Sequence, residues 1–259
     1  MSRDIDTLLF RLIRLQRANP GLGLLQFNNL LTAGQYRRLY RIVLKRFRKG
    51  DRVLDWGGGN GHFSLFLAGQ GFQTHAFSLE NPPPAFKLLE EGRCEYAKGR
   101  KDDPVSLPYS GDFFDAVISV GVLEHVRDSG GDERASLGEI HRVLKPGGLF
   151  IAYHVPNEWS WIEFLSSFFP GKHHHRWRFT KKSLKMLVES RGFELSEIRN
   201  YGFLPRWLMS RCPARVGNSK AVAAVYNFTD SVLEAILPRL CTNFLAIGLK
   251  PGGIPGPRP

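Results

Sequence analysis

The stretch that most constrains the fold of this chain is Val53-Leu-Asp-Trp-Gly-Gly-Gly-Asn-Gly61. A short apolar strand, Arg52 to Leu54, runs into the acidic residue Asp55 and a glycine loop, and residues 62–68 have the composition of a helix. A strand, a tight turn and a helix make half of a βαβ unit, in which glycines let the backbone approach a ligand closely. The chain is therefore predicted to bind a ligand at this turn of an α/β sheet.

The spacing of the glycines narrows the class of ligand. The dinucleotide fingerprint G-x-G-x-x-G fails, because counting from Gly57 puts His62 at the third glycine and counting from Gly59 puts Ser64 there. A carboxylate at Asp55 would sit badly against a pyrophosphate but well beside a positively charged ligand. The loop thus favours a cationic nucleoside over a dinucleotide.

The pattern Asp55-x-Gly57-x-Gly59-x-Gly61 resembles the first motif of the class I S-adenosylmethionine-dependent methyltransferases. In that family the glycine loop packs under the methionyl part of the cofactor, and the acid lies near its ammonium group. The resemblance therefore implies S-adenosylmethionine as the cofactor. The alternative is a glycine-rich turn without a ligand, and further motifs in the family's order argue against it.

Two more acids fit the same cofactor. Glu80 follows the predicted strand 72–79 and lies 25 residues after Asp55, where acids of nucleoside-binding folds bond the ribose hydroxyls. Asp103, four residues before a Leu-Pro-aromatic segment, is similar to the family's acid that accepts the adenine amino group, and Asp102 is the fallback. For each acid the alternative is an ordinary solvent-exposed carboxylate.

The stretch Asn81-Pro-Pro-Pro84 looks similar to the Asn-Pro-Pro-aromatic motif of amino-group methyltransferases. That motif follows the fourth strand, whereas this stretch follows the second, and Pro84 is not aromatic. We interpret it as a turn that starts a helix over residues 85–91.

The order of the elements predicts the fold class. Residues 112–120 form a continuous apolar strand typical of the centre of a sheet, and ligands of such sheets sit beyond the carboxyl ends of the strands. We therefore expect Val120 beside the cofactor. The predicted fold is α/β, with a doubly wound, mixed seven-stranded sheet whose last strand is antiparallel. Its parts are an N-terminal helical cap (1–50), a methyltransferase domain (51–249) with inserts at about 155–180 and 202–240, and a disordered tail (250–259).

Two histidines are candidates for catalysis. Methyl transfer from a sulfonium mainly requires alignment of the reactants, and a hydroxyl acceptor also benefits from a base. His125 is the first candidate, because histidine titrates near neutrality and this one follows the central strand. His154, at the end of the fifth predicted strand, is the second. The alternative is that both are hydrogen-bonded structural histidines.

The back half of the chain predicts the acceptor side. An aromatic helix after the fifth strand, a Pro-Gly-x-His loop and a Phe-Thr helix start resemble the layout of ubiquinone-biosynthesis O-methyltransferases and related small-molecule and glycan enzymes. Arg176 could bind a carboxylate or phosphate bidentately. The predicted acceptor-pocket residues are Trp159, Trp161, Phe164 and Arg176.

No metal site is predicted. The quinone enzymes carry Glu-x-x-Glu-His after the fourth strand and can hold a divalent metal there, but this chain has Gly121 in place of the first acid. The three adjacent histidines at 173–175 cannot all point at one ion.

Composition bounds the remaining alternatives. With 259 residues and 42% hydrophobic content, the chain can bury the core of one α/β domain. It has no signal peptide and no apolar run long enough to span a bilayer, and its three cysteines fit a reducing compartment, so the predicted location is the cytoplasm. The formal charge of +12 favours an anionic partner.

The basic amphipathic helix over residues 3–18 either packs on the core or docks on an anionic membrane surface, which would be the inner membrane face.

The predicted function is O-methylation of a small-molecule, lipid-linked, quinone-like or glycan acceptor. One alternative is a nucleic-acid methyltransferase, which is disfavoured because the chain has no appended RNA-binding module. Another is a non-catalytic protein that binds S-adenosylmethionine. The sequence leaves the oligomeric state open.

Overall fold

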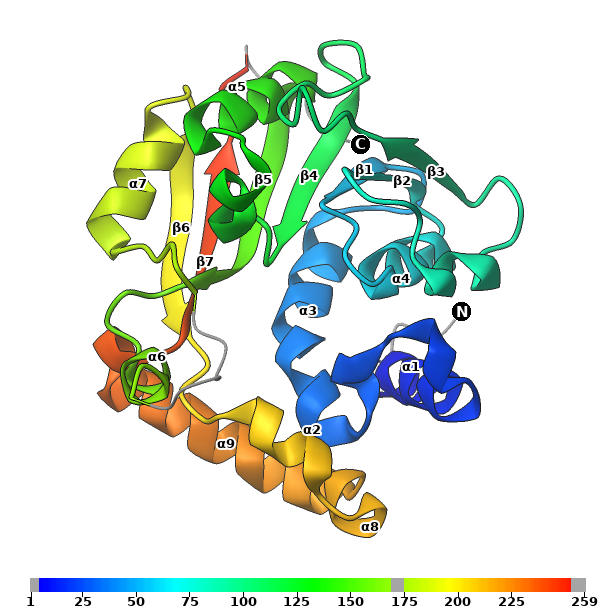
Figure 1. Ribbon diagram of the computed structural model, residues 1–259, viewed down its shortest axis with the longest axis vertical. Helices are drawn as coiled ribbons and strands as arrows, with labels where there is room; N and C mark the ends of the chain where they lie inside the picture. Colours follow the sequence, from blue (N-terminus) through cyan, green and yellow to red (C-terminus); the bar gives the residue numbers. More distant parts are fainter. Residues whose placement is uncertain (1–4, 169–174, 253–259) are drawn as a thin grey trace.

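Seven strands form one mixed sheet in the computed structural model, which describes residues 5–168 and 175–252. The strand order is β3-β2-β1-β4-β5-β7-β6, and β7 runs antiparallel to both β5 and β6 (Figure 1). This confirms the predicted doubly wound sheet with an antiparallel last strand. The strands are β1 Arg52–Trp56, β2 Gln73–Ser78, β3 Cys94–Lys98, β4 Phe114–Val120, β5 Leu144–Pro156, β6 Glu194–Tyr201 and β7 Asn243–Leu249.

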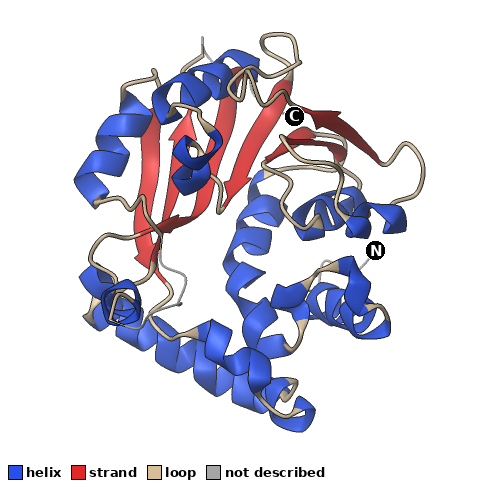
Figure 2. Cartoon of the chain, in the orientation of Figure 1, coloured by secondary structure: helices blue, strands red, loops and turns tan. Residues whose placement is uncertain are grey.

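Helices cover both faces of the sheet (Figure 2). The strands are buried on both faces, because consecutive residues such as Val53 and Leu54 point into two separate apolar cores. One core contains side chains of α1 to α4, and the other contains side chains of α5 and α7. The helices are α1 Ile5–Ala18, α2 Leu30–Ala33, α3 Arg37–Arg46, α4 His62–Gln70, α5 Glu133–Val143, α6 Trp161–Ser166, α7 Lys181–Glu189, α8 Ala214–Gly217 and α9 Lys220–Ile236.

The N-terminal helix α1 packs on the core. Its apolar side chains Leu8, Leu9, Leu12 and Ile13 are buried, while Arg11 is exposed to solvent. The first of the two alternatives for this helix is therefore the one observed. Because its apolar face is used inside the protein, α1 has no apolar face to offer to a membrane.

Two local predictions need correction. The helix expected over 85–91 is a short 3-10 helix, Pro84–Leu88, because the chain enters it extended at Pro83 and leaves it extended at Leu89. Lys250, assigned to a disordered tail, forms an ion pair with Asp112 at 2.7 Å. The tail beyond residue 252 and two of the three adjacent histidines lie outside the described residues.

Within the described residues, no helix is both long and apolar enough to span a membrane.

Candidate active site

Two cavities meet at the carboxyl ends of β1 and β4. The first has a volume of about 770 Å³ and the second about 540 Å³. Four residues line both of them: Gly59, Val120, Gly121 and His125. The two strands lie at the centre of the sheet, where its order reverses, and this is the usual ligand position in such folds. A ligand can therefore extend from the second cavity into the first.

The three motif glycines have different neighbours. A Cβ on Gly57 would lie 2.2 Å from Val122 Cγ2, and a Cβ on Gly61 would lie 3.0 Å from the Phe86 ring. A Cβ on Gly59 would meet no described atom within 4 Å, although its φ is +43°. Gly57 and Gly61 are thus required by packing within the protein. Gly59 alone leaves open space, and that space faces both cavities.

We predict that Gly59→Ala blocks the ligand without unfolding the protein. The positive φ costs about 1–2 kcal/mol of stability, because an L side chain is strained there. The new methyl group projects into the crevice, so cofactor affinity measured by calorimetry should fall by at least about tenfold. Gly92→Ala is the matched control, because Gly92 also has a positive φ of +75° and an open Cβ position. Equal cofactor affinity in the two variants would contradict the prediction.

Asp55 is a buried carboxylate at the end of β1. Its exposed fraction is 3%, and its Oδ2 accepts a hydrogen bond from the Ser64 hydroxyl at 2.6 Å. Burial raises the pKa of Asp55 to about 6, although the hydrogen bonds from Ser64 oppose this shift. Because Asp55 lines the first cavity, a cationic group of a ligand there would offset the cost of burying its charge.

The other two predicted cofactor acids differ in position. Glu80 lines the second cavity, and its Oε1 lies 3.1 Å from Lys101 Nζ. Asp103 accepts a hydrogen bond from the backbone N–H of Ser106 at 3.2 Å and is not among the residues that line either cavity. The fallback, Asp102, is paired with Arg100 instead. Glu80 thus lines a cavity, whereas Asp102 and Asp103 do not. The second cavity also has apolar walls that the sequence did not indicate: Phe77, Leu79, Val122 and Val126.

His125 is held by a carboxylate that the sequence analysis did not identify. Its Nδ1 lies 3.2 Å from Asp128 Oδ2, and Trp177 Nε1 donates a hydrogen bond to Asp128 Oδ1 at 3.1 Å. The hydrogen bond from His125 is the main cause that lowers the pKa of Asp128. Asp128 therefore stays ionised and fixes the ring, which leaves Nε2 of His125 for the substrate. In the sequence, the one feature that could have indicated this pair is the spacing of three positions between His125 and Asp128, which brings side chains together on a helical turn.

His154 is a different kind of histidine. It has a φ of +63° at an irregularity in the pairing of β5 with β7, and the Tyr201 hydroxyl lies 3.0 Å from its Nδ1. Burial, helped by the positive charge of Arg206, lowers the pKa of His154 to about 3. A histidine that is so hard to protonate is a poor base.

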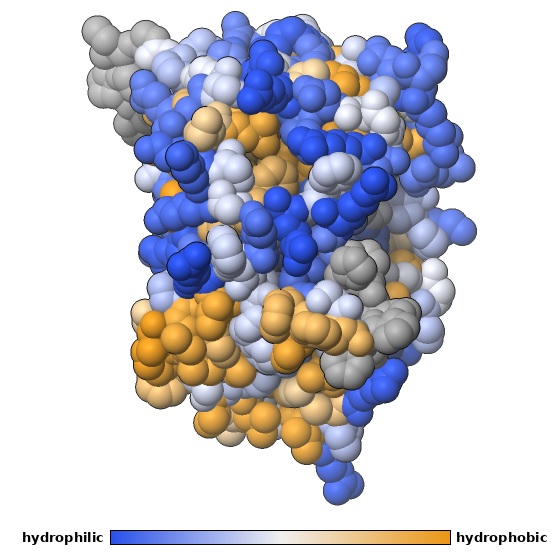
Figure 3. All heavy atoms as spheres, turned by 60° about the vertical axis from the view of Figure 1, so that its left-hand side comes forward, coloured by the Kyte–Doolittle hydropathy of each residue, from blue (hydrophilic) through white to orange (hydrophobic). Residues whose placement is uncertain are grey.

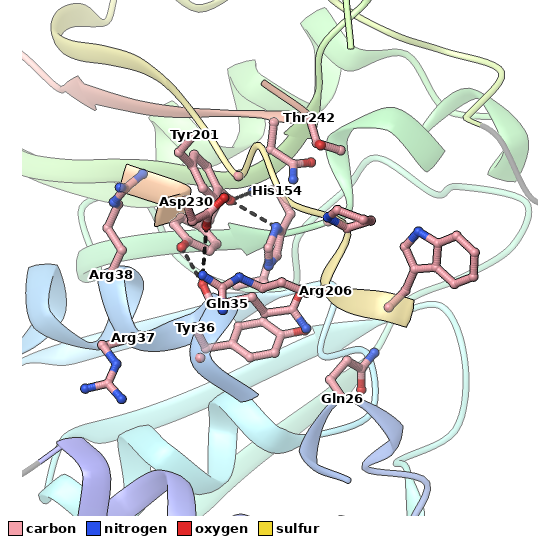
Figure 4. Close-up of a pocket in the computed structure, with 18 of the residues that line it drawn as sticks. Gln26, Gln35, Tyr36, Arg37, Arg38, His154, Tyr201, Arg206, Asp230 and Thr242 are labelled. Atoms are coloured by element: carbon pink, nitrogen blue, oxygen red, sulfur yellow. Dashed lines mark hydrogen bonds and ion pairs between the residues drawn. The ribbon is translucent and has the colours of Figure 1, made fainter. Parts of the chain in front are cut away.

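His154 forms part of an aromatic wall in the first cavity. Its ring centroid lies 5.3 Å from that of Tyr36, which in turn lies 4.1 Å from that of His62. Figure 4 shows Tyr36, His154 and Tyr201 beside one another in this cavity. Burial also lowers the pKa of His62 to about 3, so both imidazoles in the wall are uncharged near neutral pH.

A third group of titratable side chains, which includes His125, lies beside α6 in the first cavity. One potential ligand atom from each of Glu124, His125 and His175 lies within 4.8 Å of the others. Burial alone would lower the pKa of His175, but the hydrogen bond and charge of Glu163 outweigh it and raise the pKa. The sequence predicts no metal ion, whereas this geometry brings one carboxylate and two imidazoles within reach of a single cation.

The four predicted acceptor-pocket residues lie outside the lining of both cavities. Trp161 donates a hydrogen bond to the carbonyl of Phe203, and Arg176 lies over the ring of Trp177. Trp159 and Phe164 are exposed on the surface. The α6 residues that line the first cavity are instead Ile162, Glu163 and Ser166.

Comparison with known proteins identifies the family. Residues 31–198 match the family described as "Methyltransferase domain", which is more than half of the chain. The chain therefore belongs to this family. Its sheet order and its glycine motif are those of the class I S-adenosylmethionine-dependent methyltransferases, the class that the sequence predicts.

The chain spans about half the length of the curated relatives described next. A demethylmenaquinone methyltransferase of Symbiobacterium thermophilum is 29% identical over 143 residues, covering 51% of this chain and 55% of the relative. A second one, from Clavibacter sepedonicus, is 34% identical over 133 residues, covering 48% and 50%. The ubiquinone/menaquinone biosynthesis C-methyltransferase UbiE of Cupriavidus metallidurans is 27% identical over 144 residues, covering 52% and 57%.

Solved structures share the fold at lower identity. A phosphoethanolamine N-methyltransferase 2 of Haemonchus contortus, in complex with S-adenosyl-L-methionine, has a TM-score of 0.56 at 18% identity, covering 84% of this chain and 52% of that chain. A methyltransferase of Methanosarcina mazei has a TM-score of 0.54 at 20% identity, covering 82% and 97%.

The crevice fits S-adenosylmethionine, the cofactor of this family. Asp55 lines the first cavity with a buried carboxyl group, Gly59 leaves open space at the junction, and Glu80 lines the second cavity. The cofactor would thus lie with its nucleoside in the second cavity and its methionyl part at the first. Val120 and Gly121 line the junction between the two.

Proposed function

We propose that this chain methylates a hydroxyl oxygen of a small, quinone-like aromatic acceptor, which carries a lipid tail in its natural form. The observation that carries this proposal is that the first cavity is lined both by an uncharged aromatic wall and by His125, whose ring is held by Asp128 in the lining of the second cavity. A flat, neutral ring can stack on Tyr36 and the two neutral imidazoles, because aromatic pairs favour such contacts. This places the ring's hydroxyl group at the side of the cavity where His125 lies.

Four arginines line the first cavity, and three of them support a neutral acceptor over a nucleic acid; the fourth, Arg41, is exposed. Arg38 forms an ion pair with Glu234 at 2.6 Å, and Arg206 forms one with Asp230 at 2.8 Å. Arg37 is paired with Asp6. These guanidinium groups are neutralised within the protein, whereas phosphate recognition needs basic groups that are available to the ligand.

The residues of the chain then have two tasks. S-Adenosylmethionine supplies an activated methyl group when bound, so the cavity has to align the acceptor oxygen with it, a contribution of up to roughly 7–11 kcal/mol. His125 Nε2 takes the proton of the acceptor's hydroxyl group, and the Asp128 carboxylate stabilises the positive charge that then forms on the ring of His125.

The relatives from ubiquinone and menaquinone biosynthesis support a quinone-like ring, but one of them is named a C-methyltransferase. Loss of a ring hydroxyl proton activates both the oxygen and the neighbouring ring carbons. We keep oxygen as the methylated atom, because it carries most of the negative charge of the ionised ring.

Radiolabelled S-adenosylmethionine tests the proposal. The purified protein is incubated with hydroxylated quinol acceptors with and without an isoprenoid tail, with a sugar acceptor and with RNA. We expect label in the quinol, and nuclear magnetic resonance of the product should show a methoxy group. Label confined to RNA or sugar would overturn the acceptor class, and a ring-methylated product would overturn the choice of oxygen.

A further inference from the structure

Helix α9 is amphipathic in the opposite sense to an ordinary surface helix. Its two acids point inward, where Asp230 accepts hydrogen bonds from the backbone N–H groups of residues 203 and 204 and Glu234 accepts one from residue 202. Several of its large apolar side chains point outward. Val225, Phe228 and Ile236 are 66%, 71% and 67% exposed, and they follow one another at helical spacing.

Helix α6 shows the same inversion. Its acid, Glu163, is buried against His175, while Phe164 and Phe168 at the outer side of this segment are 63% and 65% exposed. Both helices line the first cavity through their inner sides. Figure 3 shows hydrophobic side chains gathered over the lower half of this face of the molecule, below a mostly hydrophilic upper half.

We use the term apolar face for the outward side chains of α9, of α6 and of the turn that follows α6, namely Phe164, Phe168, Val225, Phe228 and Ile236. Monomeric soluble proteins rarely expose large aliphatic and aromatic side chains together in this way, and such surfaces mark an interaction site.

The exposed charges at the two ends of α9 are basic. Residues 205–241 contain two acids, Asp230 and Glu234, and both are turned inward. The segment also contains Arg211, Arg215, Lys220 and Arg239, all exposed at the two ends of α9. Arg239 lies 4.5 Å over the ring of the exposed Trp159. An apolar centre with a tryptophan and basic residues at its edge is typical of a surface that enters the headgroup region of an anionic bilayer.

A second copy of the chain fits this surface less well. Two α9 helices that pair about a two-fold axis bring the basic end of one helix to the basic end of the other, because both ends carry the same sign of charge. Like charges next to one another oppose such an interface, whereas anionic phospholipids neutralise both ends.

We propose that the apolar face of α6 and α9 docks the protein on an anionic phospholipid membrane. The inner sides of the same helices line the acceptor cavity, so docking brings the cavity close to the lipid. An acceptor with a lipid tail could then enter without crossing water, a consequence that rests on the proposed function. The docking itself does not depend on the identity of the acceptor.

Co-sedimentation with vesicles tests the docking without any acceptor present. We expect the wild-type protein to bind vesicles of phosphatidylcholine with phosphatidylglycerol and to bind vesicles of phosphatidylcholine alone more weakly. Phe228→Ser should reduce binding at least about tenfold, because it removes a large apolar side chain from the contact. Met186→Ser, on the exposed side of α7, is the matched control and should bind like the wild type, because Met186 is 59% exposed but lies outside the apolar face.

Thermal unfolding and cofactor titration should be unchanged in both variants, because both side chains are largely exposed. Arg215→Gln combined with Lys220→Gln should weaken binding only to the anionic vesicles.

The proposal is overturned if the wild type binds no vesicles or if the two serine variants bind equally. It is also overturned if the wild type self-associates through Phe228 in sedimentation experiments and ignores the vesicles. Because these assays contain no acceptor, their outcome is independent of the methylation test.

Discussion

Replacement of His125 by glutamine is expected to lower kcat by about 10²–10⁴-fold, the usual contribution of a general base. Glutamine keeps a polar side chain of similar length but cannot take a proton at neutral pH. The cofactor should still bind, because the substitution leaves Asp55, Gly59 and Glu80 untouched. Single-turnover kinetics with saturating cofactor and a quinol acceptor measure the effect on the chemical step.

His154→Gln is the matched control for that experiment. The low pKa of His154 makes it a poor base, so this variant should lose acceptor affinity through the damaged aromatic wall rather than kcat. Asp128→Asn should give an intermediate loss, because the ring of His125 keeps a hydrogen-bond partner but loses the neighbouring charge. A larger loss of kcat in His154→Gln than in His125→Gln would reverse the assignment of the base.

A chelator should leave the wild-type rate unchanged. A rate that disappears with the chelator and returns with a divalent cation would show that Glu124, His125 and His175 hold an ion instead.

The sheet and the cofactor side could be predicted because their signals are local. The glycine pattern after a short strand fixes a turn that only a small number of folds use, and Asp55, Gly59 and Glu80 all line the two cavities beside that turn. Asp103 was the exception among the acids. Its carboxylate bonds the backbone of Ser106, because aspartate competes well for nearby N–H groups in a turn.

The acceptor side could not be predicted, because helical periodicity shows that a helix has two faces but not which one is turned inward. The usual assumption is that the apolar face is buried. In α9 the acids are buried instead, since Arg38 and Arg206, which pair with them, come from segments far away in the sequence. The same inversion in α6 turned Phe164 away from the cavity in which it was expected.

Asp55→Asn is expected to have opposite effects on stability and on cofactor binding. The pKa of Asp55 is raised in the folded protein from 3.8 to about 6, so folding disfavours the carboxylate. This cost is absent below pH 3.8, grows as the pH rises to about 6 and is constant above it, where it amounts to about 3 kcal/mol. The variant buries no charge and can still accept the hydrogen bond from Ser64. Its melting temperature without ligand should therefore exceed that of the wild type at neutral pH.

Cofactor affinity should change in the other direction. The ammonium group loses a charged partner in Asp55→Asn, which costs about 1.5–3 kcal/mol, or on the order of 10- to 150-fold in the dissociation constant. A cationic ligand favours the carboxylate, so wild-type affinity should rise as the pH increases through about 6, while the variant should show no such rise. Calorimetric titration across this range measures both effects. Equal affinity and equal pH dependence in the two proteins would mean that the buried carboxylate does not select the cofactor.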